Sequence, residues 1–275
     1  YLFTLKDGKF EYFDKGIKTN IVSIETPKIE KKNKRIPTLI PELDKLLDGG
    51  FERGTLNIFQ IGDKVGISYR NIMNPMFLNL VLQGIVFFYF PFKGISPNRT
   101  GKWDISAILN EICTFHLDDE ALRCLKKYFY AILYQKDKAI NNNLEYNTYI
   151  VRGEDLNEDI SDFADFATKV LSDTKADTFC VLIPSNTFEF IYGRKELKKA
   201  VQSWMNQIRK MNGILIILQT VHEKLIPNYL ATSYFKLENI DGNIVLYGEI
   251  PRTKMYVTGL DVSNSRVQVR LIPIE

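Results

Sequence analysis

The chain has 275 residues, of which 45% are hydrophobic and 25% are charged. These proportions fit a globular protein with one sizeable core and exclude a wholly disordered chain. The net charge of +3 is too small to indicate nucleic-acid binding by itself. The three cysteines lack metal-ligand spacing, and the longest apolar run, residues 84–92, is too short to cross a bilayer. We therefore expect a cytoplasmic protein without membrane contact.

Residues 1–35 are predicted to form a separate N-terminal arm. Two short stretches, residues 1–5 and 9–13, have the composition of strands, and Asp7-Gly8 between them favours a two-residue hairpin turn. A basic run at residues 31–35 follows. We interpret it as a solvated linker, with contact to an acidic partner or to nucleic acid as the alternative.

The main domain is predicted to span residues 36–275. It begins with a short helix at residues 39–47, with Pro41 in the first turn and Gly49-Gly50 at the end. The next elements are a strand at 55–61, a helix at 69–83 interrupted by Pro75, and a buried strand at 84–90. A helical insertion is expected around residues 100–145, with helices at 105–113 and 118–134.

The second half of the domain alternates strands and helices. We expect strands at 149–152, 179–183 and 214–219, helices at 160–173 and 195–211, and antiparallel strands from residue 233 to 274 with turns at 241–243 and 263–264. Buried strands that alternate with helices predict an α/β fold. Its central sheet is mostly parallel, with helices on both faces and an antiparallel C-terminal extension.

Residues 40–56 carry a resemblance to a known superfamily. A helix containing Leu43-Asp44 ends at Gly49-Gly50 and leads through Arg53-Gly54 into a strand. In order and spacing this resembles the start of the ATPase core in RecA-superfamily proteins of the KaiC-like and RadA-like kind. Gln219-Thr220 and the β-rich tail match the same pattern. The resemblance implies a RecA-like P-loop NTPase fold over residues 36–275, in an archaeal-style paralogue.

The phosphate-binding loop of that superfamily falls on residues 62–69, whose pattern is degenerate. The loop needs G-x-x-x-x-G-K-[ST], since glycines let amides curl around phosphates, the lysine meets the β- and γ-phosphates and the hydroxyl holds Mg²⁺. Here it reads Gly62, Asp63, Lys64, Val65, Gly66, Ile67, Ser68 and Tyr69. Ile67, Ser68 and Tyr69 stand in place of the second glycine, the lysine and the hydroxyl residue.

Two further positions lack the acids that the resemblance implies. Pro184-Ser185 follows the strand that would end in a magnesium-supporting aspartate, and Pro91-Phe92 follows the strand that would precede a catalytic carboxylate. We therefore expect a pseudo-ATPase with no catalytic residue, metal or cofactor. We interpret residues 62–69 as an ordinary connection packed inside the protein by Val65, Ile67 and Tyr69. The alternative is weak nucleotide binding by the loop amides, helped by Lys64.

A second candidate surface lies in residues 185–199. The predicted loop after the strand 179–183 is rich in aromatic residues, and a basic helix start follows it. Aromatic side chains stack on bases but also form protein interfaces, and cations bind phosphates. The candidate contact residues for nucleic acid or a protein partner are Phe188, Phe190, Tyr192, Arg194, Lys195, Lys198 and Lys199.

Together these features predict a non-hydrolysing scaffold or regulatory subunit that acts through protein partners, within an oligomer or a nucleoprotein complex. An active RecA-family paralogue or a second copy of the chain is the expected partner. The alternatives are a divergent ATP-binding protein of DNA recombination, repair or signalling, and a nucleic-acid-binding module.

Overall fold

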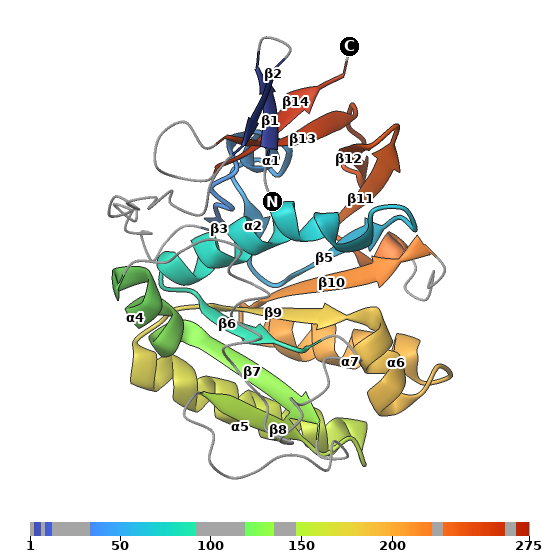
Figure 1. Cartoon of the computed structure of the whole chain (residues 1–275). Helices are drawn as coiled ribbons and strands as arrows, with labels where there is room; N and C mark the ends of the chain where they lie inside the picture. Colours follow the sequence, from blue (N-terminus) through green and yellow to red (C-terminus); the bar gives the residue numbers. More distant parts are fainter. Residues whose placement is uncertain are drawn as a thin grey trace, which may run out of the picture.

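A mostly parallel sheet runs through the centre of the molecule (Figure 1). The computed structural model describes residues 3–6, 9–12, 34–91, 119–134, 147–221, 228–261 and 268–274. In these residues a 10-stranded sheet has the order β14-β13-β12-β11-β5-β10-β9-β6-β7-β8. All neighbours from β11 to β8 run parallel. The predicted α/β fold class is confirmed.

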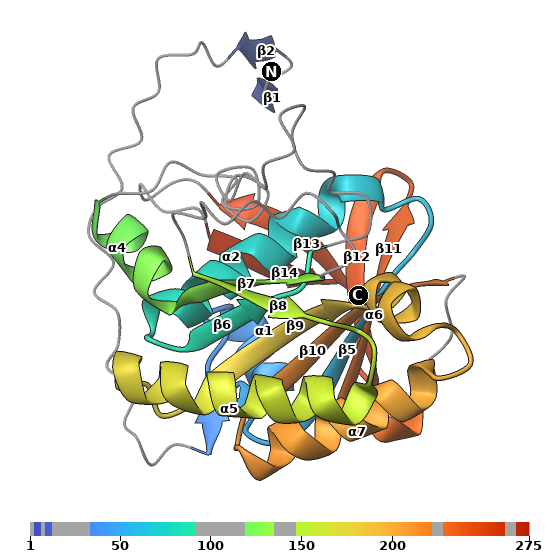
Figure 2. The same ribbon diagram turned by 90° about the horizontal axis from the view of Figure 1, so that it is seen from below.

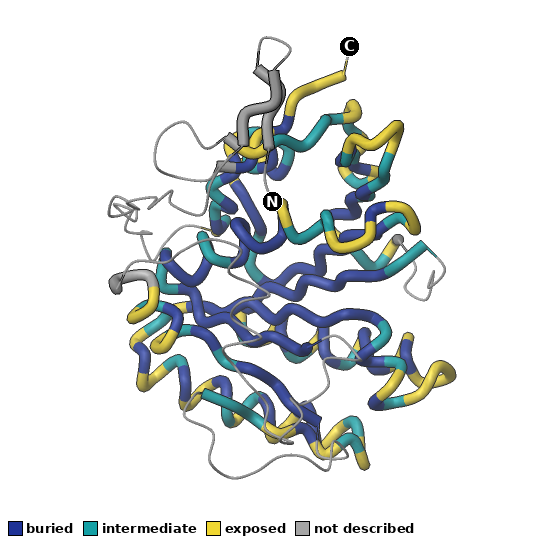
Figure 3. Tube along the Cα trace, viewed as in Figure 1, coloured by how far each residue is buried: buried dark blue, intermediate teal, exposed yellow. Residues whose placement is uncertain are grey.

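The central strands are apolar because both faces of the sheet are covered there. They are β5 (Thr55–Ile61), β6 (Val86–Tyr89), β9 (Phe179–Pro184) and β10 (Ile214–Thr220). Nearly every residue in them is buried (Figure 3). Their alternate side chains feed two separate apolar cores, one on each face of the sheet.

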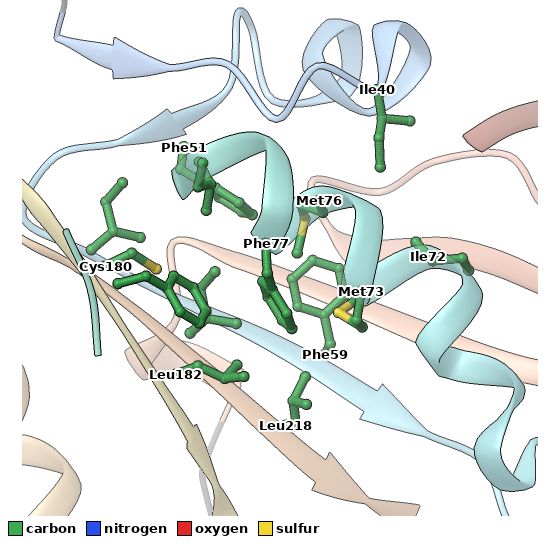
Figure 4. Packing of buried hydrophobic residues seen from close by; sticks show 14 of the residues in the cluster. Ile40, Phe51, Phe59, Ile72, Met73, Met76, Phe77, Cys180, Leu182 and Leu218 are labelled. Atoms are coloured by element: carbon green, nitrogen blue, oxygen red, sulfur yellow. The ribbon is translucent and has the colours of Figure 1, made fainter. Parts of the chain in front are cut away.

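Helices form a layer on each side of the sheet (Figure 2). One core is closed by α1 (Pro41–Leu46), α2 (Arg70–Leu82) and α4 (Asp119–Tyr128). There Met73, Met76 and Phe77 of α2 pack over Phe59 and Leu218 of the sheet (Figure 4). The other core is closed by α5 (Leu156–Thr174), α6 (Ser185–Tyr192) and α7 (Leu197–Lys210). No helix in the described part of the chain is long and apolar enough to cross a membrane.

The C-terminal strands extend the sheet in the antiparallel sense, as predicted. They are β11 (Ser233–Ile240), β12 (Asn243–Ile250), β13 (Tyr256–Asp261) and β14 (Gln268–Pro273). The turn between β11 and β12 places Asp241 and Gly242 at φ of 50° and 86°, which suits these two residue types. The other predicted turn, at 263–264, lies outside the described residues.

The N-terminal elements are short. Strands β1 (Phe3–Lys6) and β2 (Lys9–Tyr12) pair antiparallel, so the predicted hairpin forms. Strand β3 (Arg35–Ile36) pairs with β4 (Phe51–Glu52) around α1. Pro41 starts α1, and Gly49 and Gly50 follow it with φ of 105° and 120°. This opening segment therefore has the predicted helix-to-strand geometry.

The predicted helix at 118–134 is wrong in its second half. The helix ends at Tyr128, and β7 (Phe129–Tyr134) inserts between β6 and β8 (Thr148–Val151) as a full member of the sheet. Its side chains alternate between the two cores: Phe129, Ala131 and Leu133 face one, Ile132 and Tyr134 the other. A six-residue apolar run satisfies helix and strand patterns equally, and parallel partners on both sides decided the outcome.

Two smaller expectations also need correction. Pro75 does not interrupt α2, which continues through it with nine buried residues, six of which belong to the core on that side of the sheet. The loss of one backbone hydrogen bond is offset by that burial. Residues 185–192, expected to be a loop, form helix α6. The predicted helix at 105–113 lies outside the described residues.

Candidate functional site

The candidate site lies at the carboxyl ends of β5, β6, β9 and β10. Ligands in open α/β sheets bind at this edge. The 62–69 loop, the start of α6 and the end of β10 meet on the same side of the molecule (right in Figure 1). The sequence therefore correctly located the candidate loop relative to the sheet.

Three backbone amides of the 62–69 loop donate hydrogen bonds to carbonyl groups of the protein. The Gly62 N–H donates to the Leu237 carbonyl at 2.8 Å, and the Val65 N–H donates to the Gly62 carbonyl at 3.1 Å. The Ser68 N–H donates to the Val65 carbonyl at 3.1 Å, within the 3-10 helix η1 (Gly66–Tyr69). A phosphate-binding loop instead aims successive amides at its ligand. In this chain the amides of Gly62, Val65 and Ser68 already donate to carbonyl groups of the protein.

The side chains of the loop divide into anchored and exposed groups. Val65 is buried, and the half-buried Tyr69 packs against the core. Ile67, expected to pack inside, is 73% exposed, so that part of the prediction is wrong. The reason is that η1 buries Val65 immediately before it and turns Ile67 toward solvent. Asp63, Lys64 and Gly66 are also exposed, with Gly66 at a φ of 55°.

A neutral hydrogen bond links α6 to the residue that follows β6, close in sequence to the positions where the resemblance implies acids. The Thr187 hydroxyl on α6 donates to the Pro91 carbonyl after β6 at 2.8 Å. Ser185 is buried, and it stands directly after β9, where the resemblance implies an aspartate. Within the described ranges no group of His, Cys, Asp and Glu side chains has the arrangement of a metal site.

Comparison with known proteins supports the fold. A KaiC-like protein from the hyperthermophilic archaeon Pyrococcus horikoshii OT3 superimposes with a TM-score of 0.55 at 12% sequence identity. The match covers 87% of this chain and 99% of that protein. This chain has the KaiC-like RecA fold. No protein-family model matches the sequence, and no curated protein matches it either. At this identity the likeness shows the fold alone.

A buried polar network crosses the central strands of the RecA fold, and sequence reasoning missed it. The Gln219 Nε2 on β10 donates to the Tyr234 hydroxyl at 2.9 Å, and that hydroxyl donates to the Gln60 Oε1 on β5. The Oε1 atom of Gln219 is buried without a hydrogen-bond partner in the described structure. Two glutamines inside otherwise apolar strands were the available signal, because buried amides demand partners.

The second candidate surface is reshaped by α6. Phe188 is fully buried and stacks edge-on against Phe90, so it is removed from the candidate contacts. The Tyr192 hydroxyl donates to Asp159 at 3.1 Å. Burial, followed by the Asp159 charge, raises the pKa of Tyr192 and keeps it a donor in this internal bond. A helix, and not a loop, follows β9. This helix buries the Phe188 ring and directs the Tyr192 hydroxyl to Asp159.

The remaining members of that surface lie on the exterior. Phe190 is exposed on α6, and Arg194, Lys195, Lys198 and Lys199 are exposed at the start of α7. The Lys198 Nζ lies 5.8 Å from the ring centre of Tyr229, a residue that sequence reasoning missed and that is 70% exposed. Tyr229 follows β10 by nine residues, so only the fold brings it beside α7.

Proposed function

We propose that this chain is a non-hydrolysing RecA-fold protein that acts as a scaffold or regulatory subunit through protein partners. The observation that carries the proposal is the loop at residues 62–69, where the amides of Gly62, Val65 and Ser68 donate hydrogen bonds within the protein. The residues Pro184-Ser185 and Pro91-Phe92, which stand where the resemblance implies acids, add to it. A protein that keeps the carboxyl edge of the sheet but lacks the reactive groups can still present this edge as a binding surface.

Protein contact is favoured over nucleotide by the chemistry of the loop surface. Ile67 presents an apolar side chain to solvent at the sheet edge, held in place by the buried Val65 beside it. Burial of an exposed isoleucine against an apolar protein surface is favourable because it removes apolar area from water. Contact with a charged triphosphate gives no such gain. The partner that this proposal favours is an active RecA-family paralogue or a second copy of the chain.

The first test is titration with a fluorescent ATP analogue in the presence of Mg²⁺, followed by anisotropy. We expect no saturable binding up to about 1 mM, since Ser68 stands in place of the lysine and three of the loop amides already donate hydrogen bonds within the protein. A triple variant that restores the loop pattern, Ile67→Gly with Ser68→Lys and Tyr69→Thr, is the matched control and should bind more tightly than the wild type.

Two results would contradict the proposal. One is saturable binding by the wild type that unlabelled ATP competes away. The other is Mg²⁺-dependent hydrolysis that disappears in Lys64→Ala or Ser68→Ala. Either would favour the alternative of a divergent ATP-binding protein in recombination, repair or signalling.

A second candidate function, nucleic-acid binding, is favoured by one observation. Lys198 lies over the exposed ring of Tyr229, next to the cations at the start of α7. An aromatic face flanked by several cations is the arrangement that binds single strands by stacking and phosphate contact. The four cations are Arg194, Lys195, Lys198 and Lys199, of which Lys199 also pairs with Glu196 at 3.6 Å.

Salt dependence tests this second function. If four cations contact phosphates of a single-stranded oligonucleotide, affinity should fall about 50-fold between 50 and 200 mM salt. Tyr229→Ala should weaken binding further without changing the salt slope, because it removes stacking and not charge. Lys254→Ala, an exposed cation on another part of the surface, is the control. Flat or absent binding removes this function.

A further inference from the structure

A buried carboxylate joins three segments beside the second candidate surface. Asp159 lies in the first turn of α5 and is only 3% exposed. It accepts hydrogen bonds from the backbone N–H groups of Arg152 and Gly153, which follow β8, and from the Tyr192 hydroxyl at the end of α6. The Asp159 side chain therefore ties together the start of α5, the end of β8 and the end of α6.

All three groups that contact the Asp159 carboxylate are donors. The Arg152 nitrogen lies 3.1 Å from Oδ1, and the Gly153 nitrogen lies 2.9 Å from Oδ2. The Tyr192 hydroxyl lies 3.1 Å from the same Oδ2 atom. An asparagine here would bring its own amide N–H₂ group against one of these donors, whereas an ionised aspartate accepts at both oxygens. Hydrogen bonding at this position therefore favours the ionised form.

Burial at the same position favours the protonated form. In the described structure Asp159 takes part in no salt bridge, and the Arg152 side chain reaches Asp162 at 3.9 Å instead. Removal of an unpaired carboxylate from water stabilises its neutral state. Burial accordingly raises the pKa of Asp159, although its three hydrogen-bond donors act in the opposite direction.

The ionisable groups that face Asp159 come from α5, from the β8 side and from α6. Asp162, three residues further along α5, adds to the rise in the Asp159 pKa by charge repulsion. On the β8 side, the pKa of Tyr149 is raised to about 12 by burial and by the charges of Asp162 and Asp159. The pKa of Tyr192 on α6 is also raised. Among the described residues, α7 adds no charge that bears on this carboxyl. Both phenols stay protonated in neutral and mildly acidic solution, so Asp159 is the member of this buried group that changes charge.

The bond between Asp159 and Tyr192 secures the connection from α6 to α7. Gly193 begins this connection with a φ of 81°, and its N–H donates to the Glu189 carbonyl at 2.9 Å. Residues 193–196 are all exposed, so they have little packing of their own. The connection carries Arg194 and Lys195 of the second candidate surface, and the bond at its start helps to place them.

Protonation of Asp159 changes this bond in a defined way. The proton comes from water and converts one carboxylate oxygen into a donor. The backbone N–H groups of Arg152 and Gly153 cannot accept it, whereas the Tyr192 oxygen can. The bond between α5 and α6 then reverses, with the acid donating to the phenol oxygen, and the buried negative charge disappears.

We infer that Asp159 is a proton-dependent clamp on the connection between α6 and α7, tighter when Asp159 is protonated than when it is ionised. A carboxyl whose pKa is raised in the closed state binds its proton more tightly there than in an open, solvated state, so protonation favours closure. This stabilisation is fully present below the ordinary pKa of 3.8 and is lost as the pH rises through the raised pKa. The clamp operates whether or not the proposed functions hold.

Hydrogen exchange of the full chain tests the clamp. Protection factors of the Arg152, Gly153 and Gly193 amides, corrected for the intrinsic exchange rate, should be about 3-fold or more higher at pH ~4 than at pH ~7. The Lys175 amide, which bonds to the Ser172 carbonyl at the other end of α5, is the internal reference and should change by less than about 2-fold. Equal protection of the first three amides at the two pH values overturns the inference.

Two variants separate the clamp from a general effect of acid. Asp159→Asn removes the titrating group and should abolish the pH dependence, whereas Asp162→Asn, exposed on the same helix, is the matched control and should keep most of it. Tyr192→Phe leaves the carboxyl in place and removes only its link to α6. In that variant the pH dependence should persist at Arg152 and Gly153 and disappear at Gly193. Persistence in Asp159→Asn, or at Gly193 in Tyr192→Phe, contradicts the clamp.

Discussion

Gly50→Ala is expected to lower the free energy of unfolding by about 3 kcal/mol or more. Gly50 follows α1 with a φ of 120°, a region that L-residues rarely adopt. A Cβ at this position would lie 2.1 Å from the Ile36 carbonyl oxygen and 2.5 Å from its carbon. Both atoms are backbone of β3, so no side-chain rotation relieves the clash, and the β3–β4 pairing must shift. Urea unfolding monitored by circular dichroism measures the loss.

Gly242→Ala is the matched control for that result. Gly242 also has a positive φ, 86°, but a Cβ there meets nothing within 4 Å. Its substitution should cost only the conformational strain, about 1 kcal/mol. Similar losses in the two variants would mean that backbone conformation, and not the contact with Ile36, explains the glycine at position 50.

Tyr234→Phe is expected to cost about 3 kcal/mol, although it removes a single oxygen atom. The Tyr234 hydroxyl accepts from Gln219 and donates to Gln60, and all three residues are buried. Without it, one amide donor and one amide acceptor remain buried without this partner, at about 1–3 kcal/mol each. The Gln219 Oε1 already lacks a hydrogen-bond partner in the described structure, so the variant adds further unsatisfied groups to one that exists.

Tyr247→Phe provides the comparison for the second variant. The Tyr247 hydroxyl donates to Glu238 at 2.7 Å on the partly exposed outer face of β11 and β12, where water replaces the lost bond. Its cost should stay at or below about 1 kcal/mol. Equal losses in both tyrosine variants would show that the buried network contributes no more than a surface hydrogen bond.

The two residues substituted in these stability predictions lie in parts of the fold that position the candidate site. Gly50 belongs to the opening segment by which the sequence resembles the RecA superfamily, and Tyr234 lies in the central strands whose carboxyl ends form the candidate site. If both are essential for folding, this chain retains the framework of the RecA fold.

Most of the strand order along the chain followed from composition and periodicity. The runs at 179–183 and 214–219 are almost continuously apolar, which is typical of strands buried on both faces, and both are central strands. The strand at 55–61 is also central, although Thr55, Asn57 and Gln60 interrupt its apolar residues. The helices at 160–173 and 195–211 were found because their apolar residues recur at helical spacing. The opening segment was identified from its Gly49-Gly50 and Arg53-Gly54 signals.

The failures share a physical cause. Residues 129–134 and 185–192 are short segments whose local pattern fits more than one structure. The first became a strand because β6 and β8 offered hydrogen bonds on both sides, and the second became a helix because Phe188 could enter the core beside Phe90. Such partners are distant in the sequence, so no local window contains the deciding information.

The sequence alone determined the fold class and placed the candidate loop after the strand at 55–61. It also shows Ser68, Tyr69 and Pro184-Ser185 where the resemblance implies a lysine, a hydroxyl residue and an aspartate. These depend on residue identity and on the order of elements, which the chain states directly. Only the tertiary structure decided that the loop amides bond within the protein, that Ile67 faces solvent while Phe188 does not, and that Tyr229 lies beside Lys198. Those properties depend on which distant segments pack together, because burial and hydrogen bonding are set by neighbours that only folding supplies.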